Sequence, residues 1–242
     1  MDDSIGEEKP IKTIPGFINL SHHEVVAKNG SASLIDIGDG VLNLRLHSAP
    51  KPDINPIDDD IVKMQYKALE IIPGKYKGLV IGNQQDNFSA GANILMILMA
   101  SRQGAWDQIR ALVDNFQKVN VELKYAPFPV ISCPFNLTLG GGYELAAGAD
   151  KIFAHAETYM GLVEVGVGLL PAGAGCFQLL NNLSAKAKYT GNFAPMQRSF
   201  EAIGFAKVTM SGKEGFSRGY LQKGRDQIIM NGDQLIGAAK KE

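Results

Sequence analysis

The sequence predicts an α/β fold in which short buried strands alternate with helices. Apolar runs bounded by glycine or proline, typical of buried strands, lie at residues 78–82 and 130–133, and a further short strand is expected at 151–154. Between the first two runs, apolar residues recur with helical spacing over 106–123. Strands that alternate with helices in this way favour parallel strands joined by right-handed crossovers. No internal repeat or low-complexity tract interrupts the pattern.

The composition of the chain is that of an ordinary soluble protein. Its 242 residues are 45% hydrophobic and 20% charged, which leaves room for one core and a small appendage. The formal net charge of −1 gives no electrostatic case for binding nucleic acid. No apolar stretch approaches the ~20 residues that span a bilayer, so we expect no membrane insertion. The acidic N-terminus lacks the basic and apolar parts of a signal peptide, which favours a cytoplasmic location.

The N-terminal part contains three predicted elements. Residues 1–30 combine charges and prolines without periodicity, which indicates a leader or an interdomain linker. Alternating apolar residues over 31–48, divided by Asp39-Gly40, predict a β-hairpin. Acidic residues at 58–60 then precede apolar residues at helical spacing, and acidic side chains stabilise a helix N-terminus. We therefore expect a helix after the hairpin.

The central part alternates strands with small-residue turns and helices. A turn at 87–93 leads into a helix rich in apolar residues over 94–99, and a glycine turn at 140–142 leads into a helix that reaches Ala149. A glycine-rich loop is expected over 159–175. The two cysteines, Cys133 and Cys176, each lie in an apolar run, so we expect buried free thiols in a reducing compartment; no metal site is predicted.

Beyond about residue 185 the polarity rises and the pattern becomes helical. Helices are predicted at 196–207, 211–220 and 233–240, with a strand or an extended link at 207–210. The predicted organisation is therefore a leader or interdomain linker over 1–30, a core over 31–190 and a C-terminal helical region over 191–242.

The most informative motif is Leu-Thr-Leu-Gly-Gly-Gly-Tyr-Glu at residues 137–144. Three glycines allow positive φ and close approach of another group, and their N–H groups open a helix that begins near Glu144. A similar small-residue turn, Ser89-Ala-Gly-Ala92, follows an earlier strand, and a further acid, Glu164, lies in the loop at 159–175. Each feature alone also fits a purely structural role.

Together these features indicate acid/base chemistry beside a developing negative charge. Two adjacent turns can each donate one backbone N–H to the same oxygen atom. Two carboxylates, Glu144 and Glu164, then provide one group to activate water and another to deliver a proton.

The ordered set of motifs resembles the crotonase, or enoyl-CoA hydratase/isomerase, superfamily over roughly residues 32–183. Residues 88–93 are similar to the family's oxyanion turn, with Asn93 where Asp is usual, and residues 129–146 are similar to its second turn and helix. The resemblance implies a crotonase-like ββα spiral core followed by the C-terminal helical region. It implies backbone N–H donors at Ala92 and Gly141, and catalytic glutamates at Glu144 and Glu164.

The same resemblance implies a substrate carried as a coenzyme A thioester, with no covalently bound cofactor. The residues implied in coenzyme A binding are Ala90, Ala92, Ile94 and Gly141. Hydration of a 2-enoyl-CoA would give 3-hydroxyacyl-CoA. The N–H of Ala172, where the family usually has Gly, or of Gly173 would help to seat the water.

A narrower resemblance, carried by residues 77–84, 157–173 and 228–231, is to the C-terminal hydratase half of fused bacterial 3-hydroxyacyl-CoA dehydrogenases. It implies an enoyl-CoA hydratase of fatty-acid β-oxidation with a dehydrogenase domain or subunit as partner; the chain itself contains no Gly-x-Gly-x-x-Gly fingerprint for NAD. The alternatives are an enoyl-CoA isomerase, which works with a single carboxylate, and a catalytically silent domain that binds CoA thioesters or serves assembly. The superfamily typically forms trimers through its C-terminal helices, so a homo-oligomer is also implied.

Overall fold

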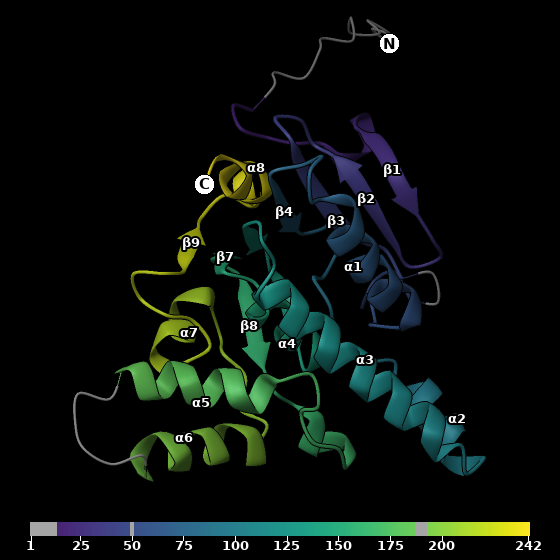
Figure 1. Cartoon of the computed structure of the whole chain (residues 1–242). Helices are drawn as coiled ribbons and strands as arrows, with labels where there is room; N and C mark the ends of the chain where they lie inside the picture. The colour runs from purple at the N-terminus through teal and green to yellow at the C-terminus, as the bar shows by residue number, and fades with distance from the viewer. Residues whose placement is uncertain (1–13, 49–50, 187–192) are drawn as a thin grey trace, which may run out of the picture.

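The computed structural model describes residues 14–48, 51–186 and 193–242, which form two sheets flanked by helices (Figure 1). The larger sheet has the strand order β1-β2-β3-β4-β5-β7-β9, and the smaller one pairs β6 with β8. The strands are β1 (Glu24–Lys28), β2 (Ala32–Asp36), β3 (Val41–Leu46), β4 (Gly78–Ile81), β5 (Val130–Ser132), β6 (Asn136–Leu139), β7 (Lys151–His155), β8 (Thr158–Gly161) and β9 (Gln227–Ile229).

The first three strands are antiparallel and the rest of the large sheet is parallel. The predicted hairpin is confirmed as β2 and β3, and both turn residues have positive φ, 58° at Asp39 and 81° at Gly40. From β3 onward each pair is parallel, as the alternation of strands and helices predicts. Strand β1 lies within the predicted leader, where sequence periodicity gave no strand signal; it pairs with β2 through a register shift between Val25 and Ala27.

In the parallel part of the fold the chain repeats one pattern: a strand of the large sheet is followed by an extended segment that lies in a second layer. After β5 the chain forms β6, and after β7 it forms β8, which pairs with β6 in parallel. Isolated parallel bridges, Ser89 with Thr138 and Ile57 with Ala92, extend this second layer to the earlier turns. The second layer therefore brings the two predicted small-residue turns side by side.

Among the described residues, four α-helices lie in the first two thirds of the chain. They are α1 (Asp59–Ile71), α2 (Ile94–Arg102), α3 (Trp106–Lys124) and α4 (Gly141–Ala147). Three of them, α1, α3 and α4, pack on the core. Asp58 caps α1 by accepting hydrogen bonds from the N–H groups of Asp60 and Ile61, and Asn93 caps α2 by accepting from Met96. Asparagine thus fills the cap position at which the family usually has Asp.

The C-terminal part forms four further helices and one strand. The helices are α5 (Gly175–Lys186), which was not predicted, and α6 (Phe193–Gly204), α7 (Gly212–Arg218) and α8 (Leu235–Lys241), which lie close to the three predicted ranges. Residues 207–210 are an extended link without a strand; the strand of this region is β9, which pairs with β7. In the predicted loop over 159–175, the first residues instead continue β8, and a 3-10 turn, η2 (Glu164–Val167), follows. Residues 1–13 of the predicted leader and the predicted boundary at 190 lie outside the described residues.

Three apolar clusters hold these layers together. The first lies under the large sheet among α1, α3 and α4, the second joins α4 to the C-terminal helices, and the third lies on the other face of the sheet beneath α8. Cys133 is buried in the third cluster, as expected. The expectation for Cys176 is wrong: its side chain is exposed, because the first turn of α5 directs Gln178 and Leu179 inward instead.

No helix in the described ranges is long and apolar enough to cross a membrane.

Candidate active site

One cavity contains all of the site residues that the sequence predicts. It has a volume of about 170 Å³ and is lined by Ala90, Ala92, Ile94, Gly141, Glu144 and Glu164, together with mainly apolar side chains from α3 and the loop before α5. Sequence reasoning missed these apolar walls, which include Phe116, Val167, Leu169 and Leu170. The structure thus brings the predicted residues together, and their catalytic and binding roles stay predictions.

Backbone hydrogen bonds tie the two small-residue turns to each other. The Ser89 N–H donates to Leu137 O (3.0 Å), and the Leu139 N–H donates to Ser89 O (3.0 Å). The approach is so close that a Cβ added at Gly142 would lie 2.4 Å from Ser89 O, so only glycine fits there. Gly140 has a φ of 51° and precedes the first residue of α4. The glycine triplet therefore serves both the sharp turn and the contact with the neighbouring turn.

This contact aligns two backbone N–H groups at the cavity wall. A Cβ added at Gly141 would lie only 3.4 Å from the Ala92 nitrogen. Within the described part of the chain, neither the Ala92 N–H nor the Gly141 N–H has an acceptor. Buried backbone donors rarely lack a partner, and Gly141 N–H also stands at a helix N-terminus, where negative charge is favoured. The pair is suited to receive an oxygen atom from a ligand.

Glu144 is buried, and backbone donors fix its carboxylate. Its Oε1 accepts hydrogen bonds from the N–H groups of Gly173 (2.8 Å) and Gly175 (2.7 Å). Burial raises the pKa of Glu144 to about 7; the two N–H groups oppose this rise, and the nearby Glu164 charge adds to it. Of the two N–H groups predicted to seat the water, that of Gly173 donates to Glu144 Oε1, and the role of the Ala172 N–H stays a prediction.

Glu164 reaches the same cavity from the neighbouring strand. Leu139 of β6 pairs with Gly161 of β8, and Gly140 N–H donates to Gly161 O (2.8 Å), so the residues after both strands emerge at one edge. Both carboxylate oxygens of Glu164 are buried without a hydrogen-bond partner among the described residues. Burial raises the pKa of Glu164, and the nearby backbone N–H groups of Val163 and Glu164 oppose this only in part.

The raised pKa of Glu144 predicts a stability change with pH. The folded protein binds the proton more tightly than the unfolded chain, whose carboxyl has a pKa of 4.5, so stability falls as pH rises from 4.5 through about 7. The difference between the two pKa values corresponds to a loss of about 3 kcal/mol in the free energy of unfolding. We expect the free energy of unfolding in urea to drop between pH 5 and pH 8 more steeply in the wild type than in Glu144→Gln. Equal slopes would contradict the prediction.

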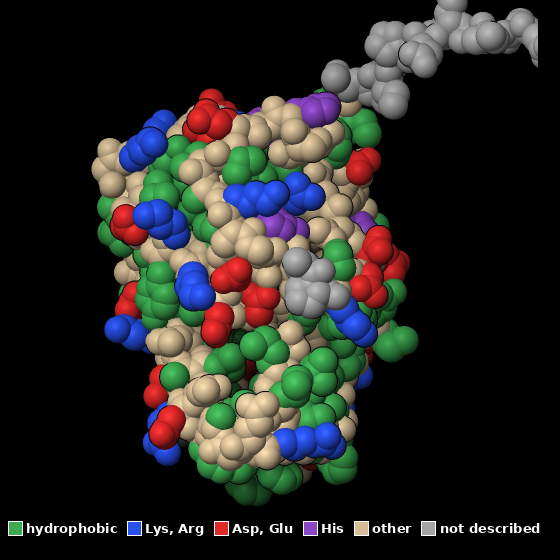
Figure 2. All heavy atoms as spheres, turned by 90° about the vertical axis from the view of Figure 1, so that its right-hand side faces the viewer, with side chains coloured by type: hydrophobic (Ala, Val, Ile, Leu, Met, Phe, Trp, Pro, Cys, Tyr) green, Lys and Arg blue, Asp and Glu red, His purple; other side chains and the backbone are tan. Residues whose placement is uncertain are grey.

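A groove of about 480 Å³ adjoins the cavity between α2 and α3. The two hollows share Ile97, Ile109 and Leu112 as walls. Helix α2 has no buried residue although it is strongly apolar; Leu95 is 64% exposed. Figure 2 shows this side of the molecule, where hydrophobic side chains gather below a group of acidic ones. An apolar path therefore leads outward from the glutamates.

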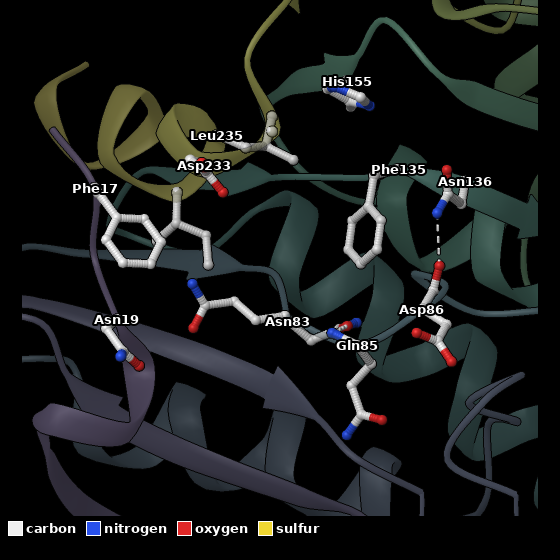
Figure 3. Close-up of a pocket in the computed structure, with 13 residues that line it drawn as sticks. Phe17, Asn19, Asn83, Gln85, Asp86, Phe135, Asn136, His155, Asp233 and Leu235 are labelled. Carbon is white, nitrogen blue, oxygen red and sulfur yellow. Dashed lines mark hydrogen bonds between the residues drawn. The ribbon is translucent and has the colours of Figure 1, made fainter. Parts of the chain in front are cut away.

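A larger cavity, of about 640 Å³, lies elsewhere in the structure, beside α8. Figure 3 shows Phe17 and Phe135 in its walls, with Asn136 donating to the backbone oxygen of Asp86 (2.7 Å). Neither Glu144 nor Glu164 lines this cavity, and it shares no residue with the smaller one. The acid/base groups therefore single out the smaller cavity as the candidate active site.

Comparison with known proteins identifies the family. The sequence profile described as Enoyl-CoA hydratase/isomerase matches residues 36–197. The chain is 43% identical over 217 residues to a Bacillus subtilis (strain 168) protein named "Probable 3-hydroxyacyl-CoA dehydrogenase", covering 90% of this chain and 27% of that protein. It is 32% identical over 148 residues to the Homo sapiens protein named "Peroxisomal bifunctional enzyme", covering 58% of this chain and 19% of that protein. The chain thus spans less than a third of the length of these relatives.

A solved structure confirms the α/β crotonase-like fold. The crystal structure of an enoyl-CoA hydratase from Geobacillus kaustophilus HTA426 superposes with a TM-score of 0.73 at 18% sequence identity, over 89% of this chain and 74% of that one. With the sequence profile and the paired turns, this superposition leads to one conclusion: the chain belongs to the enoyl-CoA hydratase/isomerase family of the crotonase superfamily.

Proposed function

We propose that this chain is an enoyl-CoA hydratase that adds water to a 2-enoyl-CoA to give 3-hydroxyacyl-CoA. The observation that carries the proposal is that two buried carboxylates, Glu144 and Glu164, line the same cavity as the Ala92 and Gly141 N–H groups, which have no acceptor in the described part of the chain. Addition of water across a conjugated double bond needs a group to hold and activate the water, a proton donor and a site for the enolate-like oxygen.

In the proposed reaction the thioester oxygen accepts hydrogen bonds from the Ala92 and Gly141 N–H groups, which form an oxyanion hole. These bonds strengthen as negative charge develops on that oxygen, and losing one such donor costs about 3 kcal/mol in comparable sites. The coenzyme A part of the substrate enters past Ala90 and Ile94, at the mouth of the cavity.

The two glutamates divide the proton transfers. Glu144 Oε1 accepts two N–H hydrogen bonds that fix the carboxylate, and its raised pKa of about 7 suits a group that takes up a proton, so we assign it to accept a proton from the water that attacks C3. Glu164 has no intramolecular partner among the described residues, and burial favours its protonated form, so we assign it to deliver a proton to C2. One C–O bond and one C–H bond form, the C2–C3 double bond is lost, and the protein gains no net proton.

Presence of both glutamates favours hydration over double-bond isomerisation, for which one carboxylate suffices. A silent binding domain is disfavoured by the buried Glu164 carboxylate, which has no partner among the described residues and costs stability without a ligand to satisfy it. The names "Probable 3-hydroxyacyl-CoA dehydrogenase" and, for a Rickettsia prowazekii relative, "Putative fatty acid oxidation complex trifunctional enzyme" support a place in fatty-acid β-oxidation. A 3-hydroxyacyl-CoA dehydrogenase domain or subunit would consume the hydroxyl product.

A spectrophotometric comparison of two substrates tests the proposed reaction. The purified chain should remove the conjugated thioester absorbance of crotonyl-CoA and form 3-hydroxybutyryl-CoA. If the chain instead generates conjugated absorbance from 3-hexenoyl-CoA and leaves crotonyl-CoA unchanged, it is an isomerase. Binding of both thioesters without turnover of either would indicate a silent domain.

The groove beside the cavity predicts how the enzyme accommodates long substrates. We propose that the acyl chain runs from the glutamates between α2 and α3, past Leu112. Leu112→Trp should narrow this path and lower kcat/KM for decenoyl-CoA about tenfold relative to crotonyl-CoA, because each buried methylene contributes about 0.8 kcal/mol. Leu95→Trp is the matched control, since Leu95 lines neither hollow. An unchanged ratio in Leu112→Trp would contradict this route.

A further inference from the structure

Two buried amide side chains lie directly behind the loop that fixes Glu144. Gln65 on α1 is fully buried and Asn120 on α3 is 3% exposed. Each interrupts the apolar face of its helix, and α1 packs against α3 (Figure 1). Neither residue lines the active-site cavity. The mechanism proposed above does not use them, so their burial calls for an explanation.

Hydrogen bonds connect these amides to the catalytic loop. Gln65 Nε2 donates to Asn120 Oδ1 (3.2 Å), and Asn120 Nδ2 donates to the backbone oxygen of Gly173 (3.1 Å). The N–H of the same Gly173 donates to Glu144 Oε1. A continuous chain of hydrogen bonds therefore runs from α1 through α3 and one glycine residue to the carboxylate.

The loop that receives this support has a strained backbone. Ala174 has a φ of 86°, a conformation that non-glycine residues rarely adopt and that costs about 1–3 kcal/mol. This conformation lies between the two N–H donors, Gly173 and Gly175, that converge on Glu144 Oε1. Such a conformation persists only where surrounding contacts hold it, and the Asn120 hydrogen bond is one of these contacts.

The amide pair is a costly way to fill a core. Gln65 Oε1 is buried and has no hydrogen-bond partner in the described ranges, and an unsatisfied buried polar atom destabilises the folded state. An apolar side chain of similar size at position 65 would avoid this penalty, whereas Asn120 also satisfies the buried oxygen of Gly173. The arrangement is therefore better explained by what it holds in place than by stability.

We propose that Asn120 is a positioning residue, supported by Gln65, that holds the Gly173 to Gly175 backbone so that both N–H groups stay on Glu144 Oε1. It acts on the chemistry only through Glu144. The kinetic consequence rests on the proposed hydratase function, whereas the effect on Glu144 does not. The two can therefore be tested separately.

The direct test is a ¹³C NMR titration of the glutamate side-chain carboxyls in the full-length chain, with Glu144→Gln to assign the signal. In Asn120→Leu the N–H bonds to Glu144 weaken, so its pKa should rise by about one pH unit, the size expected for loss of one hydrogen bond to a charged group. Hydration of crotonyl-CoA should fall about tenfold, with the rise of kcat/KM with pH displaced to higher pH.

Asn182→Leu is the matched control. Asn182 is also a buried asparagine that donates to a glycine oxygen, that of Gly219 (3.0 Å), but it lies outside the cavity. Asn182→Leu should lower the free energy of unfolding about as much as Asn120→Leu does and leave the pKa of Glu144 unchanged. If Asn120→Leu does not fold, Gln65→Leu should give a smaller shift in the same direction. If Asn120→Leu folds and the pKa of Glu144 is unchanged, the inference is overturned, even if activity falls. If the pKa shifts as expected but the wild type is inactive, only the proposed hydratase function is overturned.

Discussion

Replacing either Glu144 or Glu164 by glutamine is expected to lower kcat for crotonyl-CoA hydration by about 10³-fold, within the range for loss of general acid or base catalysis. Glutamine keeps the size and burial of each side chain but cannot accept or deliver the proton. KM should change little, because the N–H groups of Ala92 and Gly141 still bind the thioester oxygen. Steady-state kinetics with both variants measures the effect.

Glu157→Gln provides the control for this pair. Glu157 directly precedes β8 but is exposed and accepts a hydrogen bond from Tyr159 away from the cavity. Its substitution should leave kcat unchanged. If only one of the two cavity glutamates proves essential, one-carboxylate chemistry of the isomerase kind replaces the hydratase assignment.

Gly173→Ala is expected to lower kcat by about 100-fold, the effect of misplacing a catalytic group by about 1 Å. The added Cβ would lie 2.3 Å from Phe116 Cε1 and 2.7 Å from Glu144 Oε2, so the loop or both side chains must move. The overpacking should also destabilise the fold by about 1–3 kcal/mol. Kinetics together with urea unfolding separates the two effects.

The same loop region offers a control in Gly166→Ala. A Cβ at Gly166 would meet no atom within 4 Å, and its φ is not in the positive range. This variant should keep both activity and stability close to wild type. Wild-type kcat in Gly173→Ala would mean that the orientation of Glu144 does not matter for turnover.

Local sequence patterns predict most of this fold. The acidic cap before α1, the Asp39-Gly40 hairpin turn and the glycine-bounded strand β4 are all encoded within a few residues. The glycine triplet and Glu144 could be linked to Ala92 and Glu164 because turns after adjacent strands meet in space. The spiral arrangement of these elements was predicted from the family resemblance and not from local patterns.

What the sequence could not predict depends on contacts distant along the chain. β1 and β9 are short and weakly patterned, and they become strands only because β2 and β7 offer free edges. The sequence gives no sign that the Gly173 N–H donates to Glu144, because the two residues are distant along the chain and only the fold brings them together. Cys176 lies in an apolar run, but only the orientation of α5 decides that it faces outward. Gln65 and Asn120 are recognisable in the sequence only as polar residues on apolar helix faces. Their connection to Gly173 is visible only in the structure.

Mass spectrometry of the product formed from crotonyl-CoA in H₂¹⁸O tests most directly the claim that both glutamates act on one water in one cavity. The wild type should form 3-hydroxybutyryl-CoA that carries ¹⁸O at C3, and neither glutamine variant should form it at a comparable rate. Crotonyl-CoA recovered without ¹⁸O-labelled product, from a wild-type chain that is folded and binds the thioester, would contradict the account.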